Sequence, residues 1–255
     1  MRVGLCQYSP MWEDKDQNKK KILEILSKQK SEFDILVFPE MTLTGFSMNK
    51  LLAEIFEVNE SPTLDFFSKL AKELSTNIAA GFIEKEEDKV FNTLFFINRS
   101  GEIISRYRKI HLFSFARENR YYNAGTEPVI VENEDLKIGL SICYDLRFPE
   151  LFRFYGKSKV DLILNIANWP QTRIDHFVHL LKSRAIENQC FMIGVNRVGY
   201  GGREYYDGRS SIFDPLGNEI TLIKDEEKLI EAEIDLTQIQ KVREQFPFLN
   251  DIKLI

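Results

Sequence analysis

The chain has 255 residues, of which 44% are hydrophobic and 29% are charged, and its formal net charge is -5 at pH 7. This composition is that of a globular protein long enough to bury one substantial core, and it excludes the disordered and fibrous classes. The mild acidity disfavours nucleic acid as a partner, and no segment reaches the run of apolar residues that a membrane helix requires.

The first half of the chain alternates apolar, β-branched runs with segments of helical period, which is typical of an α/β protein. In chain order we expect a strand at 3–8, an amphipathic helix at 14–30, a buried strand at 35–38, a helix at 62–74, a strand at 78–83, and a hairpin of strands 90–97 and 102–107. The stretch 111–125 has no clear period and is long for a connection, so it is a candidate functional loop.

The second half of the chain repeats this alternation. We expect a strand at 136–143, a break at 144–150, a helix at 149–155, a strand at 162–166, a long helix at 173–189 and a strand at 191–196. Strands at 210–214, 219–223 and 229–234 are predicted to form an antiparallel edge of the sheet. No linker or low-complexity tract divides the sequence, so we predict one domain, residues 1–255.

Cys143 stands where the predicted strand 136–143 meets the break, which makes it the first candidate for a nucleophile. A strand end is rigid, the break lifts the side chain clear of the sheet, and the free N–H groups of a following helix favour a thiolate or an oxyanion. The alternative is an inert core thiol, because an unperturbed thiol with a pKa of about 8.5 requires an activating partner.

Histidine, the usual partner of such a thiol, is scarce in this chain. His176 and His179 lie three residues apart on one face of a predicted helix, but no cysteine or carboxylate at ligand spacing joins them, so we expect no metal site. The three cysteines are widely spaced, which argues against a disulfide framework. Together with an N-terminus that has no signal-peptide pattern, this predicts a cytoplasmic protein.

Glu40 and Lys109 are the candidates for activating the thiol. Glu40 follows a continuous buried run and a proline, so we expect a poorly solvated carboxylate that can take and return protons. Lys109 follows the predicted hairpin, and an ammonium there can stabilise the oxyanion formed when a carboxamide is attacked. Each residue could instead be structural, Glu40 in an ion pair and Lys109 on the surface.

Three segments together resemble the signature blocks of the nitrilase superfamily of carbon-nitrogen hydrolases. They are Phe38-Pro-Glu40, Arg108-Lys-Ile-His-Leu-Phe113 and Cys143-Tyr-Asp-Leu-Arg-Phe-Pro-Glu150, in the order and at separations like those of that family. The resemblance implies a four-layer α-β-β-α sandwich and a catalytic triad of Glu40, Lys109 and Cys143. It also marks Glu118 as the family's second glutamate, which gives the irregular loop a purpose.

Finer segments, among them Asn168-Trp-Pro170 and Asn196-Arg-Val-Gly199, most resemble bacterial omega-amidases, which release ammonia from the terminal amide of 2-oxoglutaramate or 2-oxosuccinamate. Such a substrate carries a carboxylate remote from the scissile bond, and we expect the guanidinium of Arg173 to bind it through two parallel hydrogen bonds. The alternative is that Arg173 is a surface arginine without a role in binding. Tyr144, Asn168 and Trp169 are expected to line the same substrate pocket. Arg147 and Glu150 are expected to brace the nucleophile turn by local pairing.

The implied mechanism needs no cofactor and passes through a thioester on Cys143. Glu40 accepts the thiol proton, and Lys109 with the backbone N–H of Tyr144 holds the oxyanion. N-carbamoyl amine hydrolysis and nitrile hydrolysis stay open as alternatives with the same triad, as does a catalytically silent binding module. The resemblance also implies a homodimer that pairs two sandwiches through a helix layer.

Overall fold

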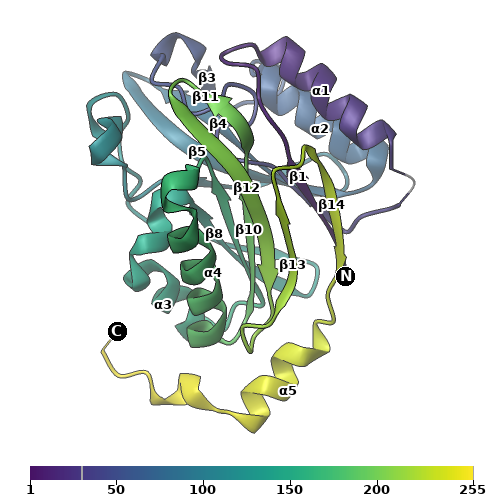
Figure 1. Cartoon of the computed structure of the whole chain (residues 1–255), viewed down its shortest axis with the longest axis vertical. Helices are drawn as coiled ribbons and strands as arrows, with labels where there is room; N and C mark the ends of the chain where they lie inside the picture. Colours follow the sequence, from purple (N-terminus) through teal and green to yellow (C-terminus); the bar gives the residue numbers. More distant parts are fainter. Residues whose placement is uncertain (30, 255) are drawn as a thin grey trace.

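The computed structural model describes residues 1–29 and 31–254, and its strands form two seven-stranded mixed sheets that lie face to face (Figure 1). The first sheet has the order β14-β1-β2-β4-β5-β6, with β3 paired to β4. Its strands are β1 (Arg2–Gln7), β2 (Ile35–Val37), β3 (Glu54–Ile55), β4 (Asn77–Glu86), β5 (Lys89–Ile97), β6 (Ile103–Arg108) and β14 (Lys228–Glu233).

The second sheet has the order β11-β12-β10-β9-β8-β7, with β13 paired to β12. Its strands are β7 (Ile130–Asn133), β8 (Leu136–Ile142), β9 (Leu162–Ala167), β10 (Phe191–Asn196), β11 (Val198–Gly201), β12 (Glu204–Phe213) and β13 (Glu219–Lys224). In each sheet three neighbouring strands are parallel, β1, β2 and β4 in the first and β8, β9 and β10 in the second. Parallel strands bring the residues that follow them to one edge of a sheet.

Helices cover the outer faces of both sheets (Figure 1). Helices α1 (Lys15–Ser27) and α2 (Pro62–Leu74) lie on the first sheet, and α3 (Pro149–Lys157) and α4 (Ile174–Asn188) lie on the second. The strand period of two explains how both faces are buried: Val3 and Leu5 of β1 belong to the core between the sheets, whereas Cys6 packs in the core beneath α1 and α2. The predicted four-layer α-β-β-α sandwich is confirmed.

The helix boundaries follow from local capping chemistry. The Asp14 side chain accepts a hydrogen bond from the Gln17 N–H and so begins α1 one residue later than predicted. That helix ends at Ser27, before the predicted end at Lys30, a residue that lies outside the described part of the chain. The predicted helix 173–189 is divided between a 3₁₀ turn, η5 (Gln171–Arg173), and α4.

The predicted antiparallel edge at 210–214, 219–223 and 229–234 is wrong in one respect. The first two segments do pair, as β12 and β13 of the second sheet. The third segment is β14, which instead pairs antiparallel with β1 of the first sheet. Turn residues between strands show that a strand ends, but they do not show which sheet the next strand joins, because that depends on long-range packing. The short strands β3, β7 and β11 are absent from the prediction.

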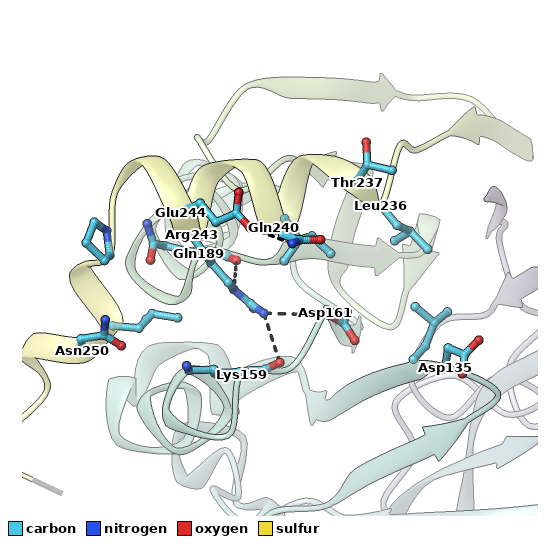
Figure 2. Close-up of a pocket in the computed structure, with 14 residues that line it drawn as sticks. Asp135, Lys159, Asp161, Gln189, Leu236, Thr237, Gln240, Arg243, Glu244 and Asn250 are labelled. Atoms are coloured by element: carbon cyan, nitrogen blue, oxygen red, sulfur yellow. Dashed lines mark hydrogen bonds and ion pairs between the residues drawn. The ribbon is translucent and has the colours of Figure 1, made fainter.

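Helix α5 (Thr237–Gln245) is also absent from the prediction, because it presents few apolar residues to the core. It lies apart from the two helix layers and is fastened at its last turn by Arg243 (Figures 1 and 2). The Arg243 guanidinium donates to the backbone carbonyls of Lys159, Val160 and Gln189, at the C-terminal ends of α3 and α4. Gln189 is the C-cap of α4, so this side chain supplies a donor to the end of that helix and ties it to the segment that follows α3.

The edge of the sandwich where the parallel strands end carries the residues of interest. Glu40 follows β2 and Lys109 follows β6 in the first sheet, while Cys143 follows β8 and Asn168 follows β9 in the second. Residues far apart in sequence therefore meet where the two sheets face each other. None of the helices in the described ranges is both long and apolar enough to traverse a membrane.

Candidate active site

Three charged side chains meet in the interior at this edge. The Lys109 Nζ lies 2.8 Å from Glu40 Oε1 and 3.0 Å from Glu118 Oε2, and all three side chains are fully buried. Glu118 reaches this place from a 3₁₀ turn, η3 (Glu118–Arg120), inside the loop that the sequence marks as functional. One ammonium is thus shared by two carboxylates, an arrangement that is stable only with close contacts and further hydrogen bonds.

Cys143 lies beside this cluster at the start of a 3₁₀ turn, η4 (Cys143–Arg147). Its φ angle is +47°, in the left-handed region that residues other than glycine rarely occupy. Its Sγ lies 3.9 Å from the backbone oxygen of Asn168, and it is 8% exposed at the wall of a pocket. Strain of this kind, held by the surrounding structure, is concentrated at functional sites.

Asn168 connects Glu40 to the side of the site that carries the nucleophile. The Asn168 backbone N–H donates to Glu40 Oε2 at 2.9 Å, and its side-chain Nδ2 donates to the Glu40 backbone oxygen at 2.7 Å. Asn168 is held in turn by its place after β9, and its backbone oxygen faces Cys143. The structure therefore places Asn168 both on the pocket wall and as a link between the two sheets.

Asp145 fastens the segment that carries Lys109 to the turn that carries Cys143. Asp145 Oδ2 accepts from the Tyr107 hydroxyl at 2.8 Å and from the Ile142 N–H at 3.0 Å. Its Oδ1 accepts from the His111 backbone N–H at 2.8 Å. A buried carboxylate with several donors is strongly held, so this residue fixes the spacing of the two segments.

The electrostatics of the cluster leave Cys143 as a neutral thiol at rest. Burial raises the pKa of the Cys143 thiol well above its usual value, the nearby Glu40 carboxylate raises it further, and Lys109 only partly opposes them. Burial opposes the charge on Lys109, yet Glu118 and Glu40 outweigh it and raise the pKa of that ammonium well above its usual range. The pKa of Glu118 is raised mainly by burial, against the pull of Lys109. A thiol in this setting needs a base to become a nucleophile.

A pocket of about 260 Å³ opens onto Cys143. Its wall is mostly aromatic and includes the four residues expected to bind substrate, Tyr144, Asn168, Trp169 and Arg173. The other lining residues are Phe46, Phe113, Phe115, Ala116, Arg147, Pro170, Glu204 and Tyr206. An apolar pocket with a few polar groups beside a buried charged cluster is the usual form of a small-molecule site.

Arg147 does not form the expected local pair with Glu150. Its guanidinium instead lies over the Trp169 ring, 4.7 Å from the centroid, and its Nη2 lies 3.2 Å from Nδ1 of His176. Arg147 and Arg173 both line the pocket, and within the described ranges they contact aromatic rings, His176 and the Thr172 hydroxyl but no carboxylate. Stacking on an aromatic face is a common alternative for arginine, and it leaves N–H donors available for a ligand.

A larger cavity, of about 610 Å³, lies beneath α5 and is shown in Figure 2. Its central group is the Arg243 guanidinium, which already donates hydrogen bonds to backbone carbonyls. Its Nη1 lies 3.9 Å from Asp161 Oδ1. None of the three cysteines lines this cavity, and all are free and buried. The smaller pocket at Cys143 is the better candidate because it combines a thiol, a nearby buried charged cluster and two arginines that have no carboxylate partner in the described part of the chain.

Several residues of the site escape sequence reasoning. Glu204 and Tyr206 come from β12, a segment with no motif of its own, and Asn92 of β5 contacts both glutamates. Only Asn92 has a signal in the sequence, since it is a polar residue inside the apolar run 90–97. The five named groups of the predicted catalytic and anchoring set, Glu40, Lys109, Glu118, Cys143 and Arg173, all lie in or beside the one pocket.

Comparison with known proteins gives a consistent result. The family model for carbon-nitrogen hydrolases matches residues 2–244. The 2-oxoglutaramate amidase of Bacillus subtilis (strain 168) is 34% identical over 252 residues, which are 98% of this chain and 97% of that protein. The omega-amidase YafV of Escherichia coli (strain K12) is 33% identical over 253 residues, 98% of this chain and 96% of that protein.

Solved structures agree with the sequence relatives. XC1258 from Xanthomonas campestris, a CN-hydrolase superfamily protein with an arsenic adduct in its active site, has a TM-score of 0.93 at 32% identity and covers 100% of this chain and 98% of its own. Nit3 of Saccharomyces cerevisiae, a member of branch 10 of the nitrilase superfamily, has a TM-score of 0.89 at 26% identity and covers 97% of this chain and 94% of its own.

Proposed function

Because this chain belongs to the carbon-nitrogen hydrolase family, and so hydrolyses amides, we propose that its substrate is the terminal carboxamide of a small 2-oxo acid such as 2-oxoglutaramate or 2-oxosuccinamate. The observation that carries this proposal is a thiol between a buried Glu-Lys-Glu cluster and a small aromatic pocket lined by two guanidinium groups that have no carboxylate partner in the described part of the chain. The cluster suits attack on an amide, and the cations suit a substrate with a distant carboxylate. The three buried, unpaired thiols are compatible with a cytoplasmic location, which we retain as part of the proposal.

The proposed reaction begins with the transfer of the Cys143 thiol proton to Glu40 as Sγ attacks the amide carbon. Lys109 and the backbone N–H of Tyr144 hold the oxyanion, and Glu118 fixes Lys109 through both carboxylate oxygens. Collapse of the tetrahedral intermediate breaks the C–N bond, and Glu40 gives its proton to the leaving ammonia. Glu40 then takes a proton from water as that water attacks the thioester, and the acid product leaves as the proton returns to Sγ.

The test is ammonia release from a panel of amides, measured for the wild type and for Arg173→Ala. We expect the wild type to prefer 2-oxoglutaramate over succinamate, N-carbamoyl amines and nitriles. Arg173→Ala should raise KM about ten- to hundredfold for the anionic amides and have little effect on uncharged amides, because only the anions lose a charged hydrogen bond.

Arg120→Ala is the matched control for this experiment, because Arg120 is an exposed arginine of the same region that does not line the pocket. It should leave both substrate classes unchanged. If Arg173→Ala raises KM equally for charged and uncharged amides, Arg173 does not bind the substrate carboxylate. A wild-type preference for N-carbamoyl amines or nitriles would replace the proposed substrate class while leaving the hydrolase chemistry in place.

We also propose that the protein is a homodimer that pairs through the α3 and α4 layer. Phe154 of α3 is 42% exposed, Ile186 of α4 is 47% exposed, and Phe248 of the C-terminal segment is 64% exposed. Exposed apolar side chains gathered on one helix layer favour association with a second copy. Light scattering should return twice the chain mass, and a monomer mass would refute the dimer without affecting the catalytic proposal.

A further inference from the structure

A buried asparagine on β5 contacts both glutamates of the cluster. Asn92 is fully buried, and its Nδ2 lies 2.7 Å from Glu40 Oε1 and 2.8 Å from Glu118 Oε1. Lys109 Nζ contacts the same two oxygens, at 2.8 Å and 3.2 Å. The two carboxylates are therefore bridged twice, once by a cation and once by a neutral amide.

The contacts determine how this amide is oriented. A side-chain amide has two N–H donors on its nitrogen, so Asn92 can give one to each carboxylate. The reversed orientation would place Oδ1 against two carboxylate oxygens, none of which carries a hydrogen in the ionised state. In the observed orientation Oδ1 is buried and has no partner in the described part of the chain.

This orientation leaves a buried oxygen without a donor, which lowers the stability of the fold, but it gives both glutamates a hydrogen bond. Most residues around Asn92 in β5, such as Phe91 and Leu94, are buried and apolar, and an amide oxygen without a donor carries a desolvation penalty that an apolar side chain would avoid. The stability of the strand therefore does not explain an amide at this position. The two N–H groups of Asn92, both directed at carboxylates, do explain it.

We propose that Asn92 is a positioning residue that holds Glu40 and Glu118 at a fixed distance from Lys109 and favours the ionised form of Glu118. The hydrogen bond from Asn92 favours the charged form of Glu118, whose pKa burial would otherwise raise further. A second cation at this position would neutralise the cluster and weaken Glu40 as a base. A neutral donor orders both carboxylates while leaving Glu40 able to accept the proton of Cys143. This inference rests on the proposed role of Glu40 as the base.

The first test is Asn92→Leu, which removes both donors and keeps a similar volume. We expect kcat to fall at least tenfold with little change in KM, because the substrate pocket does not include Asn92. We also expect the acid limb of the kcat/KM profile to move to higher pH, because the loss of the donor favours the protonated form of Glu118, which then no longer pairs as an ion with Lys109. A purely structural residue would not move that limb.

Asn165→Leu is the matched control. Asn165 is also a fully buried asparagine on a central strand, β9, with an unpartnered Oδ1, but its Nδ2 donates to Ser141 and not to the glutamates. This variant should lower the melting temperature without shifting the pH profile of kcat/KM. Thermal unfolding of both variants shows whether each one is folded under the assay conditions.

A second variant, Asn92→Asp, keeps the shape of the side chain and is expected to change the pH dependence of activity in the opposite direction from Asn92→Leu. The introduced carboxyl group faces two carboxylates, so it is expected to keep its proton at low pH and donate one hydrogen bond. As the pH rises, this carboxyl group ionises and repels the carboxylates of Glu40 and Glu118. Its activity relative to wild type should therefore decline with rising pH, whereas that of Asn92→Leu should increase.

Two outcomes decide the matter. If both Asn92 variants keep the wild-type pH profile, Asn92 is only structural and the inference is overturned. If the profiles shift as described, the inference stands. Turnover by Cys143→Ala would instead show that the proposed function has failed, so the two failures are distinguishable.

Discussion

Replacing Cys143 with alanine is expected to abolish amide turnover. Among the described residues that line the pocket, Cys143 is the one thiol and it lies beside the buried charged cluster, and water alone offers no comparable covalent route. Loss of a nucleophile that acts as a unit with its base typically costs on the order of a millionfold in kcat. Glu40→Gln should come close to the same result, because burial raises the pKa of Cys143 and the thiol then has no base.

The measurement is ammonia release under saturating 2-oxoglutaramate, combined with alkylation of thiols by iodoacetamide. Cys190→Ala is the matched control, since Cys190 is fully buried, its pKa is raised by burial, and it lies away from the pocket. It should retain turnover. In the wild type Cys143 should be alkylated before Cys6 and Cys190, and wild-type turnover in either Cys143→Ala or Glu40→Gln would remove the mechanism.

Alkylation also gives a pH dependence with a definite sign. A thiol whose pKa is raised is neutral below that pKa, and its thiolate fraction grows about tenfold for each pH unit up to it. In Glu40→Gln the thiol has no base, and burial still raises its pKa although the Glu40 carboxylate no longer adds to that shift, so the alkylation of Cys143 should be slower than in the wild type at neutral pH and rise with alkalinity. A catalytically silent binding module would show slow labelling in the wild type as well.

The sequence is a good guide to the site because Cys143 and Lys109 stand directly after strands and Glu40 stands shortly after one. Cys143 follows a predicted strand and precedes a proline-containing break, and Glu40 follows a buried run and a proline. Strand ends have one direction in a parallel sheet, so residues after them share an edge. The three motif blocks supply the rest by resemblance, and Lys109 and Glu118 do lie against Glu40.

What the sequence does not predict depends on long-range packing. β14 could join either sheet on its local pattern, and only its contact with β1 decides between them. Arg147 pairs by stacking on Trp169, a contact between two separate loops, and not with the nearby Glu150. The apolar surroundings of Asn92 mark it as unusual, but the partners of its amide become visible only when three segments are brought together.

Lys109→Met is expected to lose both activity and stability, and the loss of stability should depend on pH. Two buried carboxylates share this one ammonium, so its removal leaves buried charge without compensation, which costs about 3–5 kcal/mol of the free energy of unfolding. Turnover should fall by at least a hundredfold, because the oxyanion loses its cation. The measurements are kcat and urea unfolding across a pH series, with the exposed Lys20→Met as the matched control.

The direction of the pH effect follows from Glu118. Burial already raises its folded-state pKa above the ordinary value of 4.5, and without Lys109 the pKa rises further. A carboxyl group with a raised folded-state pKa stabilises the fold below its unfolded pKa, and this contribution is lost as the pH rises through the folded value. The deficit of Lys109→Met relative to wild type should therefore be small in acid and grow as the pH increases above about 4.5. A deficit that stays constant with pH would mean that the two glutamates are not held as ions by Lys109, and the charge arrangement on which the catalytic proposal depends would have to be abandoned.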